Sequence, residues 1–216
     1  MLALNAGARV ASVGLKRPVA TPAPLALAVR HKSKLFAPVP RAAPVKKEIA
    51  VIETAHIGPK LQNINSPLDC WVDVAPSKSL IAVVFGPYYQ VFQLKPNWQT
   101  SGRDANWAET VAIELLTRAL VAHGYTGPSI SVRSDSATAL RVLNGGKCSV
   151  KDIEECGARL RYVKEVLPFK IEGLKVPGKH NVADAISRGK KAKNGFTEVK
   201  CPVIIPEALT PYVAPA

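Results

Sequence analysis

Hydrophobic and polar residues follow regular patterns only between about residues 66 and 189. Three segments rich in β-branched and aromatic residues come first, at 70–74, 80–85 and 88–94, and short turns containing Pro, Ser, Lys or Gly separate them. Such segments are typical of strands, and turns this short join antiparallel neighbours. The pattern predicts an antiparallel meander of three strands.

The longest helical pattern follows the meander. Residues 106–123 carry apolar side chains at helical spacing, and the segment ends at Gly124. Asp104 and Asn106 are both candidates for the residue that caps its start. We expect one long helix whose apolar side packs on the strands.

A strand and two helices are predicted next. Residues 129–134 alternate between polar and apolar through Arg133 and predict a fourth strand, which is followed by a short helix that ends at residue 143. Ser149 and Asp152 have the spacing of a capping box, which predicts a helix over 150–166.

Two further elements complete the pattern. Residues 169–176 predict a fifth strand, although Gly173 interrupts it, and residues 181–188 predict a short helix closed by Gly189. The element order is βββαβααβα. We therefore expect an α/β domain over residues 66–189, with a five-stranded mixed sheet flanked by helices and its first three strands antiparallel.

Positive charge is concentrated ahead of this domain. The chain of 216 residues has a formal net charge of +13, and residues 1–50 hold nine Lys or Arg, six prolines and a single acid, Glu48. We expect residues 1–65 to form a flexible basic arm, because frequent Pro and Ala among charged residues sustain neither a helix nor a strand. Residues 190–216 form a tail that is basic at first and then rich in proline, and no structure is predicted for it.

Three interpretations of the basic arm stay open. Its first 17 residues contain no acid, which is compatible with a mitochondrial targeting segment. The arm could also contact nucleic acid through its charge, or be the remnant of a longer polyprotein. We expect an intracellular protein, nuclear or cytoplasmic unless the arm directs it to mitochondria.

Two classes of protein are disfavoured by the composition. The four cysteines contain no Cys-x-x-Cys pair, so neither a zinc ribbon nor a dense disulfide framework fits, and a reducing compartment is expected. The longest apolar runs fall far short of the ~18 residues that span a membrane. We expect no membrane partner.

Four acidic residues stand where a metal-dependent nuclease needs them. They are Asp73 in the first strand, Glu109 near the start of the long helix, Asp135 directly after the fourth strand and Asp184 in the last helix. Carboxylates that converge repel one another unless cations neutralise them, and Mg²⁺ prefers oxygen ligands. Asp135 could instead cap the helix that follows it, and Asp184 could be a surface helix residue.

The long helix carries two glutamates, and its geometry favours one of them. Glu109 and Glu114 lie ~140° apart around the helix, so both cannot face one site. Glu109 shares its side with residues expected to pack on the sheet, whereas Glu114 has Arg118 at i+4, the spacing of a solvated ion pair. We therefore expect Glu109 to join the aspartates.

Distinct short motifs surround these acids. They are Asp-Cys-Trp-Val-Asp at 69–73, Trp-Ala-Glu at 107–109, Arg-Ser-Asp-Ser at 133–136 and Val-Pro-Gly-Lys-His-Asn-Val-Ala-Asp-Ala-Ile-Ser-Arg at 176–188. Together they resemble the ribonuclease H domain of reverse-transcribing elements, and the last is similar to the V-P-x-x-x-N-x-A-D-x-x-S-R ending of retroelement and pararetrovirus-like polymerases. The chain looks closest to fungal elements that pair a reverse transcriptase with a tyrosine recombinase. The resemblance covers residues 66–189.

This resemblance implies a ribonuclease H-like fold and an endonuclease that cuts the RNA strand of RNA/DNA hybrids. It also implies two Mg²⁺ ions, with Mn²⁺ as an alternative. The implied catalytic and metal-binding residues are Asp73, Glu109, Asp135 and Asp184. The expected nucleic-acid contacts are Ser136, Lys179, His180, Asn181 and Arg188. The expected partners are the hybrid and a reverse transcriptase or recombinase from the same element, and we expect a monomer.

Two rival functions stay open. The family's second strand usually contains glycine, whereas residues 80–85 have none, and Pro76 lies in the turn beside the expected metal site. The domain could therefore be a catalytically inactive nucleic-acid-binding or scaffold derivative of the same fold. An integrase-like polynucleotidyl transferase is the other alternative, although such enzymes typically use an Asp, Asp, Glu series.

Overall fold

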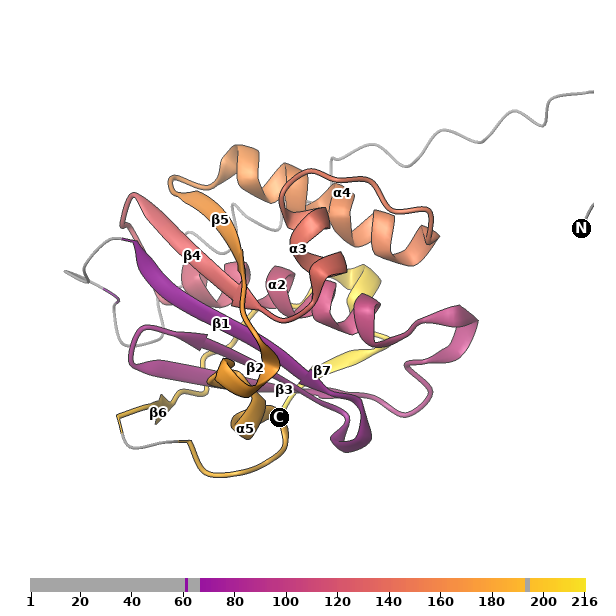
Figure 1. Cartoon of the computed structure of the whole chain (residues 1–216), viewed down its shortest axis with the longest axis horizontal. Coiled ribbons are helices and arrows are strands. Elements are labelled where there is room, and N and C mark those ends of the chain that lie inside the picture. Colours follow the sequence, from indigo (N-terminus) through magenta and orange to yellow (C-terminus); the bar gives the residue numbers. More distant parts are fainter. Residues whose placement is uncertain (1–60, 62–66, 193–194) are drawn as a thin grey trace, which may run out of the picture. The chain divides into compact units, whose positions relative to one another are not determined.

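The structure is a computed structural model that describes Leu61, residues 67–192 and residues 195–216 (Figure 1). The arm predicted over residues 1–65 lies outside the described residues, except for Leu61. Within the described part of the chain, no helix is long and apolar enough to cross a membrane.

The first three strands form the predicted antiparallel meander. β1 (Leu68–Ala75) pairs with β2 (Leu80–Phe85), and β2 pairs with β3 (Tyr88–Leu94). A short 3₁₀ helix at Pro76–Lys78 makes the turn between β1 and β2. The sequence pattern predicted the bounds of β2 and β3 and most of β1.

Two parallel strands extend the sheet beyond β1. β4 (Ser129–Ser134) lies parallel to β1, and β5 (Lys170–Lys175) lies parallel to β4. The register pairs Trp71 with Arg133, and the two strands run in the same direction. Asp73 and Asp135, each two residues further along, therefore lie at the same edge of the sheet, where the carboxyl ends of β1 and β4 meet.

The sheet has seven strands among the described residues, so the prediction of five was wrong. β6 (Thr197–Glu198) pairs parallel with β3, and β7 (Val213–Pro215) pairs antiparallel with the same strand. Strands of two and three residues are too short for alternation to be recognised in a sequence. Proline is also compatible with β7, because an outer strand does not need every N–H for pairing.

Helices lie on both faces of the sheet (Figure 1). One face is covered by α2 (Ala105–Ala122), α3 (Ala137–Leu143) and α4 (Lys151–Val166), and the other carries α5 (Ala183–Ser187). The predicted order βββαβααβα is confirmed, with β6 and β7 added after it. Further 3₁₀ helices lie at Thr100–Gly102, Gly178–His180 and Glu207–Leu209.

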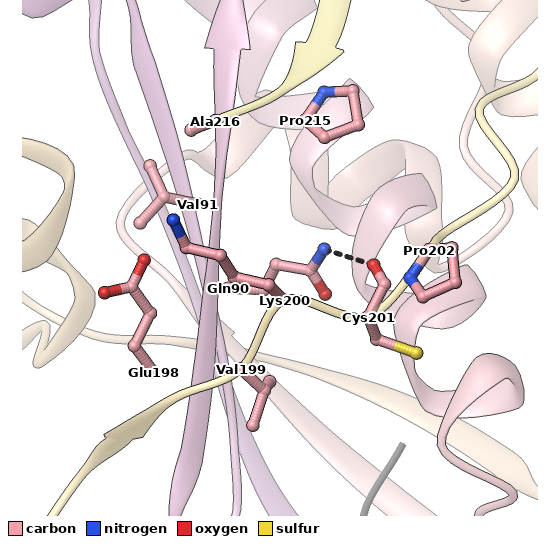
Figure 2. Close-up of a pocket in the computed structure, with 9 residues that line it drawn as sticks. All are labelled: Gln90, Val91, Glu198, Val199, Lys200, Cys201, Pro202, Pro215 and Ala216. Carbon is pink, nitrogen blue, oxygen red and sulfur yellow. Dashed lines mark hydrogen bonds between the residues drawn. The ribbon is translucent and has the colours of Figure 1, made fainter. Parts of the chain in front are cut away.

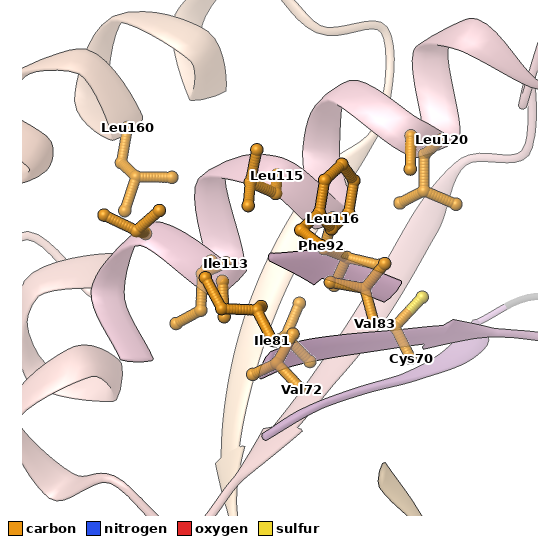
Figure 3. Packing of buried hydrophobic residues seen from close by; sticks show 14 of the residues in the cluster. Cys70, Val72, Ile81, Val83, Phe92, Ile113, Leu115, Leu116, Leu120 and Leu160 are labelled. Carbon is orange, nitrogen blue, oxygen red and sulfur yellow. The ribbon is translucent and has the colours of Figure 1, made fainter. Parts of the chain in front are cut away.

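The main core lies between the sheet and α2 (Figure 3). Val72, Val83 and Phe92 project from the strands toward Leu116 and Leu120 of the helix, and all five are buried. Full burial of an aliphatic or aromatic side chain stabilises a fold by about 1.5–3 kcal/mol. This core therefore holds α2, and with it Glu109, against β1.

β2 is apolar throughout because both of its faces are covered. Ile81 and Val83 belong to the main core, whereas Ala82 and Val84 form a second cluster with residues of α5. A strand buried on both faces reads as a continuous apolar run. The second cluster seats α5 next to Asp73.

The capping box predicted for α4 was wrong. The residue before the helix is Val150, which makes no side-chain capping bond, and Asp152 instead forms an ion pair with Arg103 at 2.9 Å. Glu154 Oε2 accepts a hydrogen bond from the backbone N–H of Cys148 over 2.7 Å. Asp152 has a partner outside its own helix, which the local sequence does not reveal.

Candidate metal centre

Three carboxylates from separate elements converge at one edge of the sheet. Asp73 comes from β1, Glu109 from the second turn of α2 and Asp135 from the residue after β4. One oxygen of each lies within 4.8 Å of one oxygen of both others. The structure thus brings together three of the four acids that the sequence singled out, while their catalytic role stays a prediction.

Glu109 has only one of its carboxylate oxygens bonded. The backbone N–H of Val74 donates to Oε1 over 3.2 Å, whereas Oε2 is buried and has no hydrogen-bond partner among the described residues. The side chain is 8% exposed. Burial, and then the negative charges of Asp73 and Asp135, raise the pKa of Glu109 from 4.5 to about 9. An ionised Glu109 carboxylate is costly at this buried position unless it takes up a proton or binds a cation.

Asp73 is 4% exposed and has both oxygens bonded. Its Oδ1 accepts from Asn181 Nδ2 over 3.2 Å, and its Oδ2 accepts from Ser187 Oγ over 2.5 Å. Burial is the largest influence on its pKa, which rises from 3.8 to about 6. The Ser187 bond acts against this rise in the pKa, whereas the charges of Asp135 and Asp184 add to it.

Asp135 is exposed and lies against a glycine. A Cβ atom added to Gly178 would stand 2.7 Å from Asp135 Oδ2, closer than atoms can approach without a shift. The alternative in which Asp135 caps α3 was wrong, because the cap is Ser136, whose Oγ accepts from the backbone N–H of Ala139 over 3.2 Å.

Asp184 lies in α5 but is not part of the group of three. Arg188 holds its Oδ1 through Nε at 2.8 Å and Nη2 at 2.7 Å, one turn further along the helix. Its charge still acts on the pKa of Asp73. Ligation by Asp184 therefore stays a prediction, and it would compete with the Arg188 pair.

The residues expected to contact nucleic acid fall into two groups. Lys179 and His180 are exposed on the 3₁₀ helix that begins at Gly178, and Arg188 is exposed directly after α5, as its C-cap residue. Ser136 is partly buried and Asn181 is 5% exposed, with its amide bonded inside the protein. Contact with nucleic acid stays a prediction for all five.

Glu114 faces away from the cluster, as the helix geometry predicted, but it is not solvated. Its side chain is 0% exposed and forms ion pairs with Arg118 at 3.3 Å and with Arg159 at 2.9 Å. Arg159 comes from α4, which packs on α2. The expected i+4 partner was confirmed, and the expected exposure was wrong because α4 covers this side of the helix.

Ser187 and Gly178 were not expected at the site. Ser187 donates to Asp73 across 114 positions of sequence, and Gly178 leaves the space that Asp135 occupies. Both belong to the segment 176–188, whose motif was the only signal in the sequence that could have pointed to them.

A cavity of about 280 Å³ lies elsewhere, at the edge of β3 between the segments that carry β6 and β7 (Figure 2). Gln90 Nε2 donates to the backbone oxygen of Cys201 over 2.8 Å at this cavity. Burial raises the pKa of the Cys201 thiol, which disfavours the reactive thiolate. None of Asp73, Glu109 and Asp135 lines the cavity, so we take the carboxylate cluster as the candidate site.

The carboxylate cluster fits a divalent cation. Its donors are hard oxygen atoms from Asp73, Glu109 and Asp135, and Glu109 Oε2 is buried without a hydrogen-bond partner among the described residues. Mg²⁺ and Mn²⁺ both suit carboxylate ligands, and a cation would offset the burial and the neighbouring negative charges that together raise the pKa of Glu109. The cluster could hold a metal ion, and the donor set alone does not select between these two.

The chain was compared with protein families, curated proteins and solved structures. No model of a protein family matches the chain, and no curated protein matches it. Among solved structures, the chain is similar to RNase H1 from the halophilic archaeon Halobacterium salinarum NRC-1, with 18% sequence identity and a TM-score of 0.37, over 51% of this chain and 85% of that one.

Proposed function

We propose that this chain is a Mg²⁺-dependent endonuclease of the ribonuclease H type that cuts the RNA strand of RNA/DNA hybrids. The observation that carries the proposal is the convergence of Asp73, Glu109 and Asp135 within 4.8 Å, on three elements in the order that the sequence motifs predicted. Assignment to a retroelement-type enzyme rests on the motif at 176–188 alone.

The three carboxylates would hold the metal, and Asp184 would contribute after release from Arg188. A pair of bound Mg²⁺ ions supplies a water of lowered pKa as the nucleophile and stabilises the leaving oxygen. Each oxygen of Asp73 accepts one hydrogen bond, from Asn181 or from Ser187, and still has a lone pair available. Glu109 is held against the backbone of β1, so its position does not depend on the substrate.

The surface beside the cluster is suited to a phosphate backbone. Lys179 and His180 are exposed next to Gly178, where an added Cβ atom would meet the Asp135 carboxylate. Positive side chains fix the register of a nucleic acid through its phosphates. The 2′-hydroxyls of the RNA strand, reached from the wide minor groove, would distinguish a hybrid from DNA.

The test is cleavage of a labelled RNA/DNA hybrid by the purified full chain with Mg²⁺ or Mn²⁺. We expect cuts in the RNA strand only, no cutting of double-stranded DNA, and loss of cleavage in Asp73→Asn. Glu198→Gln, an exposed acid on β6, is the matched control and should cleave like the parent. A folded parent that cuts no hybrid with either ion would sink the proposal.

A catalytically inactive nucleic-acid-binding derivative is the second candidate. The observation that favours it is the Asp184–Arg188 pair, which keeps the fourth acid outside the cluster. This alternative predicts binding that weakens with salt in proportion to the phosphate contacts, and binding of equal strength in Asp73→Asn. Cleavage that Asp73→Asn abolishes would reject it.

A further inference from the structure

We infer that Asn181 and Ser187 are positioning residues that fix the Asp73 carboxylate in the orientation in which it binds a divalent cation. The inference rests on the proposed metal-dependent function. Both residues come from the segment that carries α5, more than 100 positions from Asp73 in sequence. They contact Asp73 from the side of the sheet that α5 covers, opposite the main core.

Asn181 uses both ends of its amide. Nδ2 donates to Val72 O over 2.8 Å and to Asp73 Oδ1 over 3.2 Å, while Oδ1 accepts from the backbone N–H of Ala183 over 3.1 Å. A flipped amide would place its oxygen against the Val72 carbonyl and its NH₂ against a donor, so only one orientation satisfies these groups. The amide therefore joins β1 to the first turn of α5 with a fixed direction.

Ser187 holds the other oxygen of Asp73. Its hydroxyl is 2.5 Å from Asp73 Oδ2 and 3.0 Å from the backbone oxygen of Asp184, and the side chain is 0% exposed. A hydroxyl has one proton, and the bond to a carboxylate is the shorter and stronger of the two. The second contact joins Ser187 to Asp184, the residue that we expect from the sequence as the fourth ligand.

The two bonds together prevent rotation of the Asp73 carboxylate. Each oxygen accepts from a different residue, so a turn about the Cβ–Cγ bond would break both. A carboxylate oxygen has a second acceptor position, which stays available for a cation. Partners of this kind, which orient a ligand without touching the metal, typically contribute 10–100-fold to metal affinity or activity.

The experiment measures Mn²⁺ binding to the full-length chain by calorimetry, with hybrid cleavage as a second measurement. Ser187→Ala is expected to weaken Mn²⁺ binding about 10-fold, and Ser187→Thr, which keeps the hydroxyl, to restore it. Asn181→Ala is expected to have an effect of similar size, with its folding checked by thermal denaturation.

The control is Thr117→Val. Thr117 is buried in α2, and its hydroxyl donates to the backbone oxygen of Glu114 three positions earlier over 2.7 Å, as Ser187 can to Asp184. Thr117→Val removes this buried hydroxyl without altering the carboxylates, so the Mn²⁺ affinity of the variant should equal that of the parent.

Weakened binding in Ser187→Ala with rescue in Ser187→Thr supports the positioning role. Equal Mn²⁺ affinity in the parent and Ser187→Ala overturns it, and so does an equal loss in Thr117→Val. A parent that binds Mn²⁺ and cleaves hybrid while Ser187→Ala is unchanged refutes only the positioning role. A parent that neither binds Mn²⁺ nor cleaves hybrid overturns the proposed function, and the positioning role with it.

Discussion

The backbone N–H of Val74 donates to Glu109 Oε1 over 3.2 Å, so the strand that carries Asp73 also holds the glutamate of α2. This bond uses one oxygen of Glu109 and leaves the other buried, without a hydrogen-bond partner among the described residues. Strand and helix are held in contact by the main core, so Glu109 cannot move to water to relieve its charge. The metal-free protein therefore carries an electrostatic cost at this site.

The stability of the metal-free protein is expected to fall as pH rises. The folded pKa of Glu109 is about 9 against an ordinary 4.5, and that of Asp73 is about 6 against 3.8. The folded state then binds more protons than the unfolded state, so this stabilisation is complete below about pH 4 and is lost progressively up to about pH 9. Thermal denaturation in EDTA across this range measures the slope.

The same pH series with Mn²⁺ is the companion measurement. Cations bind the deprotonated carboxylates of the folded state, so the added ion should reduce or reverse the slope. A metal-free protein whose stability rises between about pH 5 and pH 9 would contradict the electrostatic account of Glu109 and Asp73.

Glu109→Gln is expected to stabilise the metal-free protein at about pH 8. At this pH Glu109 is ionised in the unfolded state but must take up a proton to fold, because its pKa rises from 4.5 to about 9. Glutamine keeps the side-chain shape without that cost, and each pKa unit corresponds to about 1.4 kcal/mol. We expect a gain on the order of 2–4 kcal/mol in urea denaturation with EDTA, together with loss of Mn²⁺ binding. A destabilised variant would show that the charge of Glu109 is already compensated without metal.

Glu114→Gln is expected to have the opposite effect on stability. Glu114 is buried and forms ion pairs with Arg118 and Arg159, so its neutralisation removes the negative charge that both guanidinium groups share at this position. The expected loss is about 3–5 kcal/mol, with Mn²⁺ affinity unchanged in the folded protein. Glu155 forms an ion pair with Lys151 at 3.8 Å, and both side chains are exposed. Glu155→Gln should therefore reduce the free energy of unfolding by no more than about 1 kcal/mol.

Gly178→Ala tests the space beside Asp135. The new Cβ would stand 2.7 Å from Asp135 Oδ2, and the exposed carboxylate can turn away with little cost to the fold. We expect a nearly unchanged melting temperature and a loss of metal affinity of about 10-fold, measured by calorimetry. Lys175→Ala, on the neighbouring end of β5, is the control, and equal affinities in both variants would contradict the prediction.

Tyr212→Ala tests how the segment after residue 196 is held to the domain. The Tyr212 ring meets Trp107 edge-on at 5.7 Å, and the Arg103 guanidinium lies 3.8 Å from the Tyr212 ring centre. Loss of the ring should cost about 3 kcal/mol in chemical denaturation, whereas Tyr212→Phe should keep most of the stability. Equal stability of the Ala variant and the parent would mean that this contact does not hold the segment.

Local sequence pattern was enough to predict most of the fold. The ranges of β2, β3 and β4 follow from alternation or from a continuous apolar run, both of which are properties of neighbouring residues. The local pattern did not predict β6 and β7, which are strands only because β3 provides an edge to pair with. It failed for the start of α4, where Asp152 pairs with Arg103 instead of capping the helix.

The sequence by itself determined the order of the elements and singled out the three acids that converge, together with Asp184, because periodicity and short motifs are encoded within a few residues. Only the tertiary structure decided that Glu114 is buried against α4, that Ser187 bonds Asp73, and that Arg188 pairs with Asp184 outside the group of three. These outcomes depend on which side chains meet across folded elements. A contact between residues 114 positions apart leaves no periodic trace in the chain.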